Sequence, residues 1–242
     1  MRRRNVLPMA VIYILVVSMI LGIACVGNKV TSVLAERMPL PRHNTIVIDA
    51  GHGGEDGGAV SCTGGLESTY NLEIALKLND LLHLLGYRTS MIRTKDISIY
   101  KEGNTIAAKK VSDLKERVRI VNETENAVLV SIHQNTFSDS RYRGAQVFYG
   151  PKGESQSLAE AMQCTFCSTV NPESNRKIKK ADSIYLMQQV DCTGVLVECG
   201  FLSNPQEEAL LRSHDYQLKL VSVIGGTLSQ FLTESHPADI IK

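Results

Sequence analysis

The sequence predicts an α/β fold: a single-domain three-layer sandwich in which helices cover both faces of a mixed, mostly parallel sheet. Two observations lead to this prediction. First, short apolar runs typical of buried strands alternate with longer segments of helical periodicity. Second, a chain of 242 residues with 43% hydrophobic content is large enough for one sizeable domain and a small appendage.

The first half of the domain is predicted to contain three strands and two helices. In chain order they cover residues 45–49 (strand), 67–85 (helix), 87–93 (strand), 113–125 (helix) and 127–132 (strand). The first helix has an apolar stripe and stops at Gly86. The second is predicted to start at Asp113, because Glu116 follows three residues later as in a capping box. Residues 94–111 are expected to form a loop.

The second half is predicted to contain three strands and three helices. Its main elements cover residues 145–149 (strand), 155–170 (helix), 184–187 (strand), 195–197 (strand) and 216–232 (helix). A further helix starts at Asn204, because Pro205 stands at the first helical position and Glu207 at the third. Cys164 and Cys167 lie three residues apart in a helix, and we expect both to be small core residues on one face.

The N-terminal segment differs from the rest of the chain. Three arginines at positions 2–4 precede an uncharged stretch whose apolar part, residues 6–26, is 21 residues long. A helix that crosses a bilayer needs about 20 such residues, and preceding arginines favour a cytoplasmic N-terminus. Residues 1–28 are therefore predicted to be a membrane anchor or a signal sequence, followed by a linker (29–44), the main folded domain (45–234) and a tail (235–242).

The charge balance argues against one class of partner. The chain has 26 Lys+Arg against 25 Asp+Glu, so it has no excess of basic residues for a broad positive face. Binding to nucleic acid is therefore not expected.

Four side chains in the predicted domain are suited to metal-dependent chemistry. His52 lies in the glycine-rich turn after the first strand, Glu67 begins the first helix, and His133 follows the strand that ends at residue 132. Two imidazoles and a carboxylate are typical zinc ligands, and a catalytic zinc site keeps one position open for water. Glu198, at the end of a later strand, is a further carboxylate that could move protons during hydrolysis.

Three more residues are candidates for the surroundings of this centre. Asp49 could hold the second ring nitrogen of a ligand histidine, or it could cap the turn that follows its strand. Asn135 would point the same way as His133 if that strand continues, and it could bind substrate. Arg93 is a candidate for contact with the site, and Glu198 could instead be the partner of this arginine.

Each of these features also has a simpler explanation. The segment 51–58 could be a phosphate-binding turn after a strand, although it lacks both the GxGxxG spacing and a P-loop Lys-Ser/Thr pair. His133 could be a satisfied core histidine, and Glu67 a carboxylate in the first turn of a helix. Because all four features occur together, a zinc hydrolase is the favoured interpretation.

Five motifs in the sequence resemble those of a known family in the same order. They are IVIDAGHGGEDGGA from residue 46, NLEIALKLNDLL from residue 71, RTKD from residue 93, SIHQN from residue 131 and VLVECGFLSNPQE from residue 195. Over roughly residues 45–232 the chain resembles the zinc-dependent N-acetylmuramoyl-L-alanine amidases of the type 3 amidase fold. The resemblance implies zinc ligands at His52, Glu67 and His133, and a catalytic glutamate at Glu198.

The reaction implied by the resemblance is hydrolysis of the amide between the lactyl group of N-acetylmuramic acid and the L-alanine of the stem peptide. The short, single-domain architecture is similar to that of spore-cortex amidases, whose action allows muramic δ-lactam to form. The alternatives are a zinc peptidase or deacetylase acting on peptidoglycan, and a non-catalytic wall-binding protein.

The resemblance also leads to expectations about partners and location. Peptidoglycan is the expected substrate, and the N-terminal segment is expected to contact the membrane. An activating or delivering protein is expected because the sequence contains no recognisable wall-binding module. The catalytic domain is expected outside the cytoplasm, anchored or secreted, with the forespore intermembrane space as a candidate location.

Overall fold

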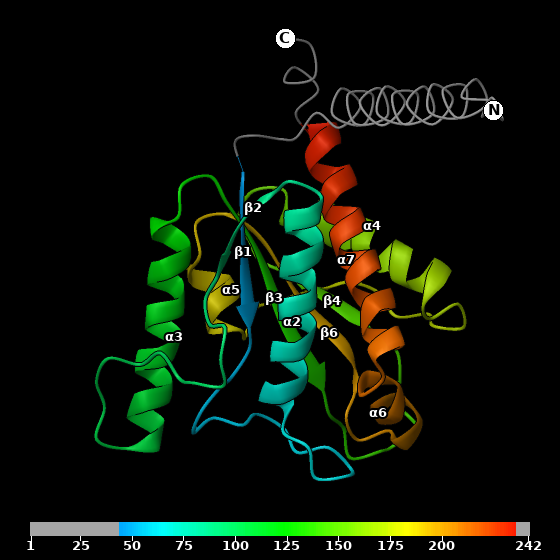
Figure 1. The fold of residues 1–242 in the computed structure, drawn as a ribbon, viewed down its shortest axis with the longest axis horizontal. Coiled ribbons are helices and arrows are strands. Elements are labelled where there is room, and N and C mark those ends of the chain that lie inside the picture. Colours follow the sequence, from blue (N-terminus) through cyan, green and yellow to red (C-terminus); the bar gives the residue numbers. More distant parts are fainter. Residues whose placement is uncertain (1–43, 236–242) are drawn as a thin grey trace, which may run out of the picture. The chain divides into compact units, whose positions relative to one another are not determined.

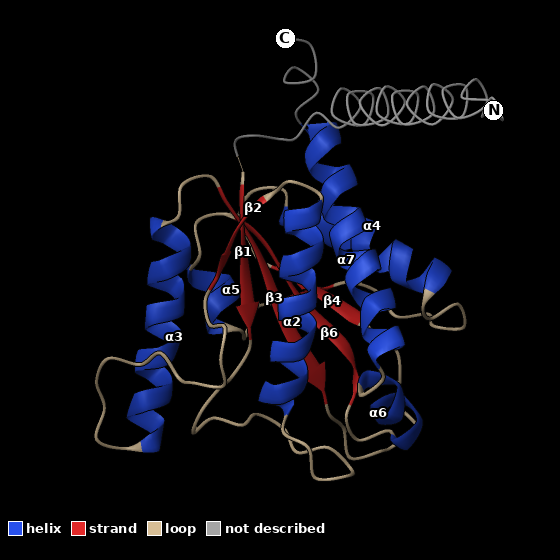
Figure 2. Ribbon diagram, in the orientation of Figure 1, coloured by secondary structure: helices blue, strands red, loops and turns tan. Residues whose placement is uncertain are grey.

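A mixed six-stranded sheet forms the centre of the computed structural model, which describes residues 44–235 (Figures 1 and 2). The strands are β1 (Thr45–Ala50), β2 (Arg88–Met91), β3 (Ala127–Asn135), β4 (Gln146–Tyr149), β5 (Lys179–Lys180) and β6 (Thr193–Phe201). Their order across the sheet is β2-β1-β3-β6-β4-β5. All neighbouring strands are parallel except β4 and β6, which are antiparallel.

Helices cover both faces of this sheet. They are α2 (Glu67–Leu84), α3 (Ile106–Glu123), α4 (Ser155–Thr169), α5 (Tyr185–Gln189), α6 (Pro205–Leu211) and α7 (His214–Ser235). Helices α2, α4 and α7 pack on one face, while α3 and α5 lie on the other (Figure 1). The predicted three-layer sandwich with a mostly parallel sheet is therefore confirmed.

The alternation of side chains along the central strands produces two apolar layers. In β3, Val128, Val130 and Ile132 face α2, α4 and α7, whereas Leu129 joins the smaller cluster on the side of α3 and α5. Residues on successive positions of a strand point to opposite faces, and a parallel sheet buries both. Burial of both faces requires apolar side chains at nearly every position, which explains the near-continuous apolar runs in the sequence.

The second predicted helix begins earlier than its sequence indicates. Its N-cap is Thr105, whose hydroxyl accepts a hydrogen bond from the Ala108 amide at 3.1 Å. Asp113, predicted to be the first residue, lies inside α3, and its carboxylate accepts a hydrogen bond from the Ile99 amide at 2.7 Å. The prediction was wrong because α3 buries only Arg117 and Val121. Its early turns therefore lack the apolar periodicity that locates a helix.

Two further predictions were wrong. Residues 184–187, predicted to be a strand, belong largely to the short helix α5, whose Leu186 and Met187 are buried. An apolar run of four residues does not distinguish a strand from a helical turn. Cys164, predicted to be a core residue, is exposed and Cys167 is half-buried, because the buried stripe of α4 runs along other positions.

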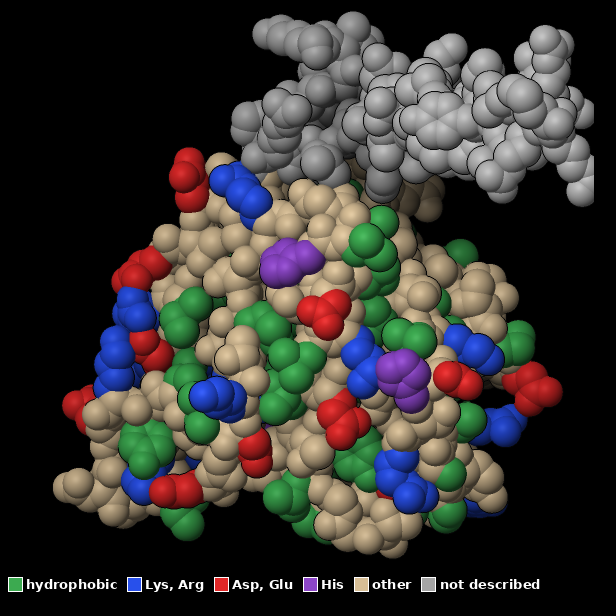
Figure 3. All heavy atoms as spheres, viewed as in Figure 1, with side chains coloured by type: hydrophobic (Ala, Val, Ile, Leu, Met, Phe, Trp, Pro, Cys, Tyr) green, Lys and Arg blue, Asp and Glu red, His purple; other side chains and the backbone are tan. Residues whose placement is uncertain are grey.

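The parallel arrangement of β1, β3 and β6 decides where the candidate residues lie. The carboxyl ends of these neighbouring strands meet at one edge of the sheet, which is where ligands bind in open α/β folds. On the face of the molecule in Figure 3, basic and acidic side chains are interspersed.

The predicted membrane segment (1–28) and nearly all of the linker and tail lie outside the described residues. Among the helices of residues 44–235, none has the length and apolarity needed to cross a membrane.

Candidate metal centre

Three of the predicted residues come together at the carboxyl edge of the sheet. His52 follows β1, Glu67 is the first residue of α2, and His133 lies near the end of β3. Their potential ligand atoms all lie within 4.8 Å of one another. The Glu67 carboxylate lies between the rings, 3.3 Å from His52 Nε2 and 3.0 Å from His133 Nδ1. This cluster could hold a metal ion.

Glu67 is a buried carboxylate whose position is fixed on several sides. Its Oε2 accepts a hydrogen bond from the Ala59 amide at 2.9 Å, and its Oε1 accepts one from the Gln134 amide at 3.1 Å. Burial by itself raises the pKa of Glu67, but hydrogen bonds from His133 and His52 outweigh burial and hold the pKa far below its usual range. Glu67 is therefore ionised, as a metal ligand must be.

His52 is held in a conformation that side chains rarely adopt. Its φ angle is +60°, in the left-handed region, where strain is tolerated mainly at functional sites. Its Nδ1 lies 2.9 Å from Asp56 Oδ2, so Asp56 can orient the ring and leave Nε2 directed at Glu67. Burial lowers the pKa of His52, but Glu67 and Asp56 outweigh it and raise the pKa to about 9.

Asp49 does not orient a ligand histidine, contrary to the first of the two roles considered for it. Its carboxylate is buried, forms an ion pair with Arg117 and accepts a hydrogen bond from Ser131 at 2.6 Å. Asp56 has the orienting position instead. The spacing of four residues between His52 and Asp56 was visible in the sequence, but nothing distinguished Asp56 from the other polar residues of the turn.

Two buried arginines hold the backbone of the turn that contains His52. Arg93 donates hydrogen bonds to the carbonyls of Ala50 (2.8 Å) and Gly51 (3.0 Å). Arg117 donates to the carbonyls of Ala50 (3.0 Å) and His52 (2.8 Å). Arg93 is only 2% exposed, so its guanidinium supports the turn and is not accessible to substrate. Arg117 was not predicted from the sequence, where its only signal was an arginine on the buried side of a helix.

Glu198 lies beside the three clustered residues. In the parallel pairing of β3 and β6 it stands opposite His133. Its Oε2 is buried and has no hydrogen-bond partner within the described residues, and no ion pair there joins it to Arg93. Burial raises the pKa of Glu198 to about 7. Burying a carboxylate oxygen without a hydrogen-bond partner costs stability. The surroundings of Glu198 are therefore those of a functional group.

Asn135 is half-buried at the end of β3, two residues beyond His133. The register between β3 and β6 shifts here, because Asn135 pairs with Phe201 whereas His133 pairs with Glu198. The strand does not continue regularly through this position, so simple alternation does not fix where Asn135 points. Its contact with substrate stays a prediction.

The arrangement defines a class of protein. Two imidazoles and an ionised carboxylate fit the three protein ligands of a catalytic divalent-metal site, and the enclosed Glu198 oxygen fits a proton-transfer group beside it. An α/β sandwich with these groups at the carboxyl edge of its sheet has the arrangement of a hydrolase whose site could hold a metal ion.

The particular family follows from comparison with known sequences. Residues 46–229 match the N-acetylmuramoyl-L-alanine amidase family, and the chain belongs to this family. The germination-specific N-acetylmuramoyl-L-alanine amidase of Bacillus subtilis is 38% identical over 193 residues, which cover 78% of this chain and 80% of that protein. The N-acetylmuramoyl-L-alanine amidase LytC of Bacillus subtilis is 29% identical, but only 35% of its length is matched.

Solved structures agree with this assignment. The CwlD amidase from Clostridioides difficile, described in complex with the GerS lipoprotein, is 38% identical and has a TM-score of 0.75. The match covers 78% of this chain and 98% of that one. An N-acetylmuramoyl-L-alanine amidase from Clostridium difficile 630 is 30% identical, with a TM-score of 0.68 over 79% of this chain and 97% of that one. The chain is thus an amidase of peptidoglycan.

Proposed function

We propose that His52, Glu67 and His133 bind Zn²⁺ and that the chain hydrolyses the amide between the lactyl group of N-acetylmuramic acid and L-alanine. The observation that supports this proposal is the cluster of two imidazoles and one ionised carboxylate beside Glu198, a half-buried residue whose Oε2 is buried and has no hydrogen-bond partner among the described residues. When bound, zinc supplies a Lewis acid that polarises the scissile carbonyl and lowers the pKa of water. A Cβ at Gly51 would lie 2.2 Å from the His133 ring and one at Gly58 would lie 2.6 Å from Glu67, so these glycines let the turn pack closely against the proposed ligands.

Glu198 is the proposed general base and acid. Its carboxylate accepts a proton from the attacking water and then donates that proton to the departing alanine nitrogen. A catalytic acid–base group works best when its pKa lies near the working pH, and burial raises the pKa of Glu198 to about 7. No other carboxylate in the described residues combines a buried, unpartnered oxygen with a position opposite a candidate ligand.

The proposed biological setting is the spore cortex. A relative of similar length is named a germination-specific amidase, which supports a role in cortex maturation, where stem-peptide removal would precede muramic δ-lactam formation. A peptidoglycan substrate supports a location of the catalytic domain outside the cytoplasm, and in this setting the proposed location is the space between the two forespore membranes. We further propose that the segment 1–28 attaches the protein to the membrane or directs its export.

A protein partner is proposed as well. A structural relative is described in complex with a lipoprotein, which supports an activating or delivering protein for this chain. Copurification from sporulating cells, followed by an activity assay with and without the captured protein, tests this proposal. A captured protein that leaves both zinc affinity and turnover unchanged would contradict it.

Mass spectrometry of digested peptidoglycan tests the reaction. The zinc-loaded protein is expected to release intact stem peptides and to leave N-acetyl groups in place, whereas the metal-free protein releases none. Shortened stem peptides would indicate a peptidase, and lost acetyl groups a deacetylase. Binding without any product from the zinc-loaded protein would indicate a non-catalytic wall-binding protein.

Three variants test the assigned roles. Glu198→Gln is expected to keep zinc and to lose about 100-fold or more in turnover, because it removes the proton shuttle and no ligand. His133→Ala is expected to lose zinc affinity. Glu125→Gln, an exposed carboxylate before β3, is the matched control and is expected to keep full activity. Full turnover by Glu198→Gln would contradict the mechanism.

A further inference from the structure

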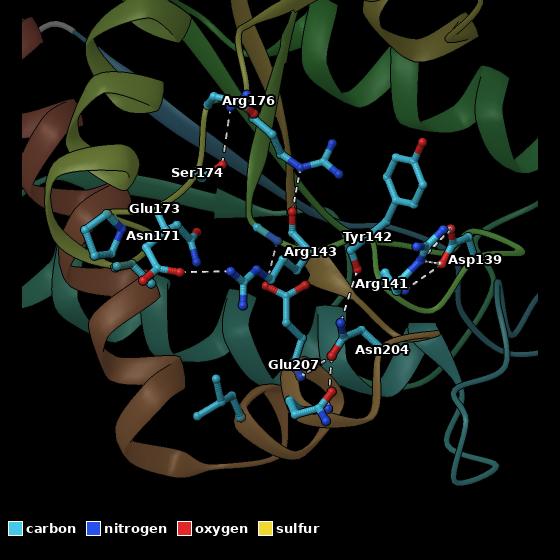
Figure 4. A pocket seen from close by; sticks show the side chains of 16 residues that line it. Asp139, Arg141, Tyr142, Arg143, Asn171, Glu173, Ser174, Arg176, Asn204 and Glu207 are labelled. Atoms are coloured by element: carbon cyan, nitrogen blue, oxygen red, sulfur yellow. Dashed lines mark hydrogen bonds and ion pairs between the residues drawn. The ribbon is translucent and has the colours of Figure 1, made fainter.

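A cavity of about 830 Å³ lies beside the loop that leads into β4 (Figure 4). Its walls are the loop before β4, the segment after α4 and the start of α6. No motif in the sequence predicts a catalytic or binding role for these residues. Gln146, at the beginning of β4, joins this region to the centre, because it stands opposite Glu198 in the antiparallel pairing of β4 and β6.

Most charges that line the cavity are already paired. Arg141 forms an ion pair with Asp139 at 2.7 Å, and Arg143 forms one with Glu173 at 2.9 Å. Both arginines are largely exposed, with 89% and 66% of their side-chain surface accessible.

The remaining carboxylate in the cavity is also engaged. Burial raises the pKa of Glu207, and its two oxygens accept hydrogen bonds from the backbone amides of Gly144 (2.7 Å) and Phe201 (2.8 Å). Glu207 is thus held by the backbone and forms no ion pair within the described residues.

Arg176 is the arginine of this cavity without an ion pair among residues 44–235. Its Nε donates to the carbonyl of Arg143 at 2.7 Å, and its Nη1 donates to Gln146 Oε1 at 3.0 Å. Its guanidinium lies over the ring of Phe201, 4.5 Å from the centroid. These hydrogen bonds use two of its five N–H donors. The half-buried cation is therefore fixed in place, with donors left for an anion.

Arg176 is connected to the proposed catalytic residue Glu198 through Gln146. Residues directly opposite in an antiparallel pair point to the same face, with Cβ atoms about 4.5–5.5 Å apart. Gln146 and Glu198 are such a pair, and Arg176 is bonded to Gln146. The guanidinium is thus one side chain removed from the proposed proton shuttle. In Figure 4 its side chain extends across the cavity toward Tyr142.

We propose that Arg176 binds the first free carboxylate of the stem peptide beyond the L-alanine whose amide is cleaved. This inference rests on the proposed function and specifies the substrate of the same site. Consecutive Cα atoms of a peptide are 3.8 Å apart. The carboxylate of the residue after L-alanine therefore lies about as far from the scissile nitrogen as one strand of the sheet lies from its neighbour. Glu198 and Gln146 stand on two such neighbouring strands. An arginine presents paired donors that match a carboxylate in a way a lysine cannot.

Two soluble substrates that differ only at this carboxylate test the proposal. Each is a muramoyl peptide, and the second has a carboxamide in place of the carboxylate. The zinc-loaded full-length chain is expected to cleave the acid with a kcat/KM about 10- to 100-fold higher than the amide, mainly through KM, because a charged hydrogen-bonded pair is lost. Arg176→Gln is expected to cleave both substrates at the rate of the wild-type protein on the amide.

Arg141→Gln is the matched control, since it removes one positive charge from the rim of the same cavity and keeps the preference. Arg176→Lys is expected to recover part of the preference, and thermal unfolding reports whether any variant has lost its fold. Equal kcat/KM of the wild-type protein on the two substrates would overturn this inference, whatever the variants do. Cleavage of neither substrate would overturn the proposed function itself, and this inference with it.

Discussion

Replacing Arg117 with methionine removes the charge that holds Asp49 and the turn containing His52. Arg117 is 3% exposed and Asp49 is 1% exposed, so neither charge has water as a substitute partner. Without Arg117, the Asp49 carboxylate keeps the hydrogen bond from Ser131 and loses its ion pair. Breaking a buried pair by removing one partner costs about 3–5 kcal/mol. That is a large share of the roughly 5–15 kcal/mol by which domains are stable.

Urea unfolding of the metal-free protein at pH 7 measures this loss by linear extrapolation. Arg119→Met, on the same helix but exposed to solvent, is the matched control and is expected to lose far less, because solvent-exposed pairs contribute little. In the double variant Asp49→Asn/Arg117→Met the buried Asp49 charge is removed together with its partner, and the loss of the Arg117–Asp113 ion pair is the same as in Arg117→Met. The loss of stability in the double variant is therefore expected to be smaller than the sum of the two single losses.

The pH dependence gives a second test of the same reasoning. Burial raises the pKa of Asp49, but Arg117 outweighs it and holds the pKa below its usual range in the wild-type protein. The stabilisation by Asp49 is then present above its unfolded pKa and is lost as the pH falls through its folded pKa. In Arg117→Met, Ser131 and His133 still lower the pKa of Asp49 but Arg117 no longer does, so burial raises this pKa relative to the wild-type protein and the loss of stability should shrink as the pH falls from 7 toward 5. A loss below about 1 kcal/mol at pH 7, or strict additivity in the double variant, would refute the reasoning.

Three further predictions concern the site and the cysteines. Gly51→Ala would place a Cβ 2.2 Å from His133 Nε2, so calorimetry should detect at least tenfold weaker zinc binding; unchanged affinity would contradict the position of this ring. A bound cation lowers the pKa of Glu198 from about 7, so the acidic limb in the pH profile of kcat should have its midpoint between about pH 4.5 and 7. A midpoint above pH 7 would contradict this prediction. Burial raises the pKa of the Cys199 thiol, so a thiol reagent should label Cys62 and Cys164 in the native protein and Cys199 only after unfolding; rapid native labelling of Cys199 would disprove its burial.

Some features of this protein were determined by the sequence because they depend on neighbours along the chain. The helix cap at Asn204 was predicted correctly, and its side chain accepts hydrogen bonds from the amides of Gln206 and Glu207. Buried strands were predicted from their apolar runs, which reflect burial of both faces of a parallel sheet. The sequence also predicted the candidate ligands, since glycine turns and strand ends are local features.

The tertiary structure decided which charged residues meet. Arg117 is the partner of Asp49 because packing of α3 brings together groups that are 68 positions apart, whereas Asp56 meets His52 within one turn, four residues along the chain. The start of α3 depended on a cap at Thr105 that periodicity did not locate. The position of Arg176 near Glu198 depends on the antiparallel strand β4, which places Gln146 opposite Glu198. Spacing along a chain sets local conformation, whereas partners across strands depend on how the sheet is assembled.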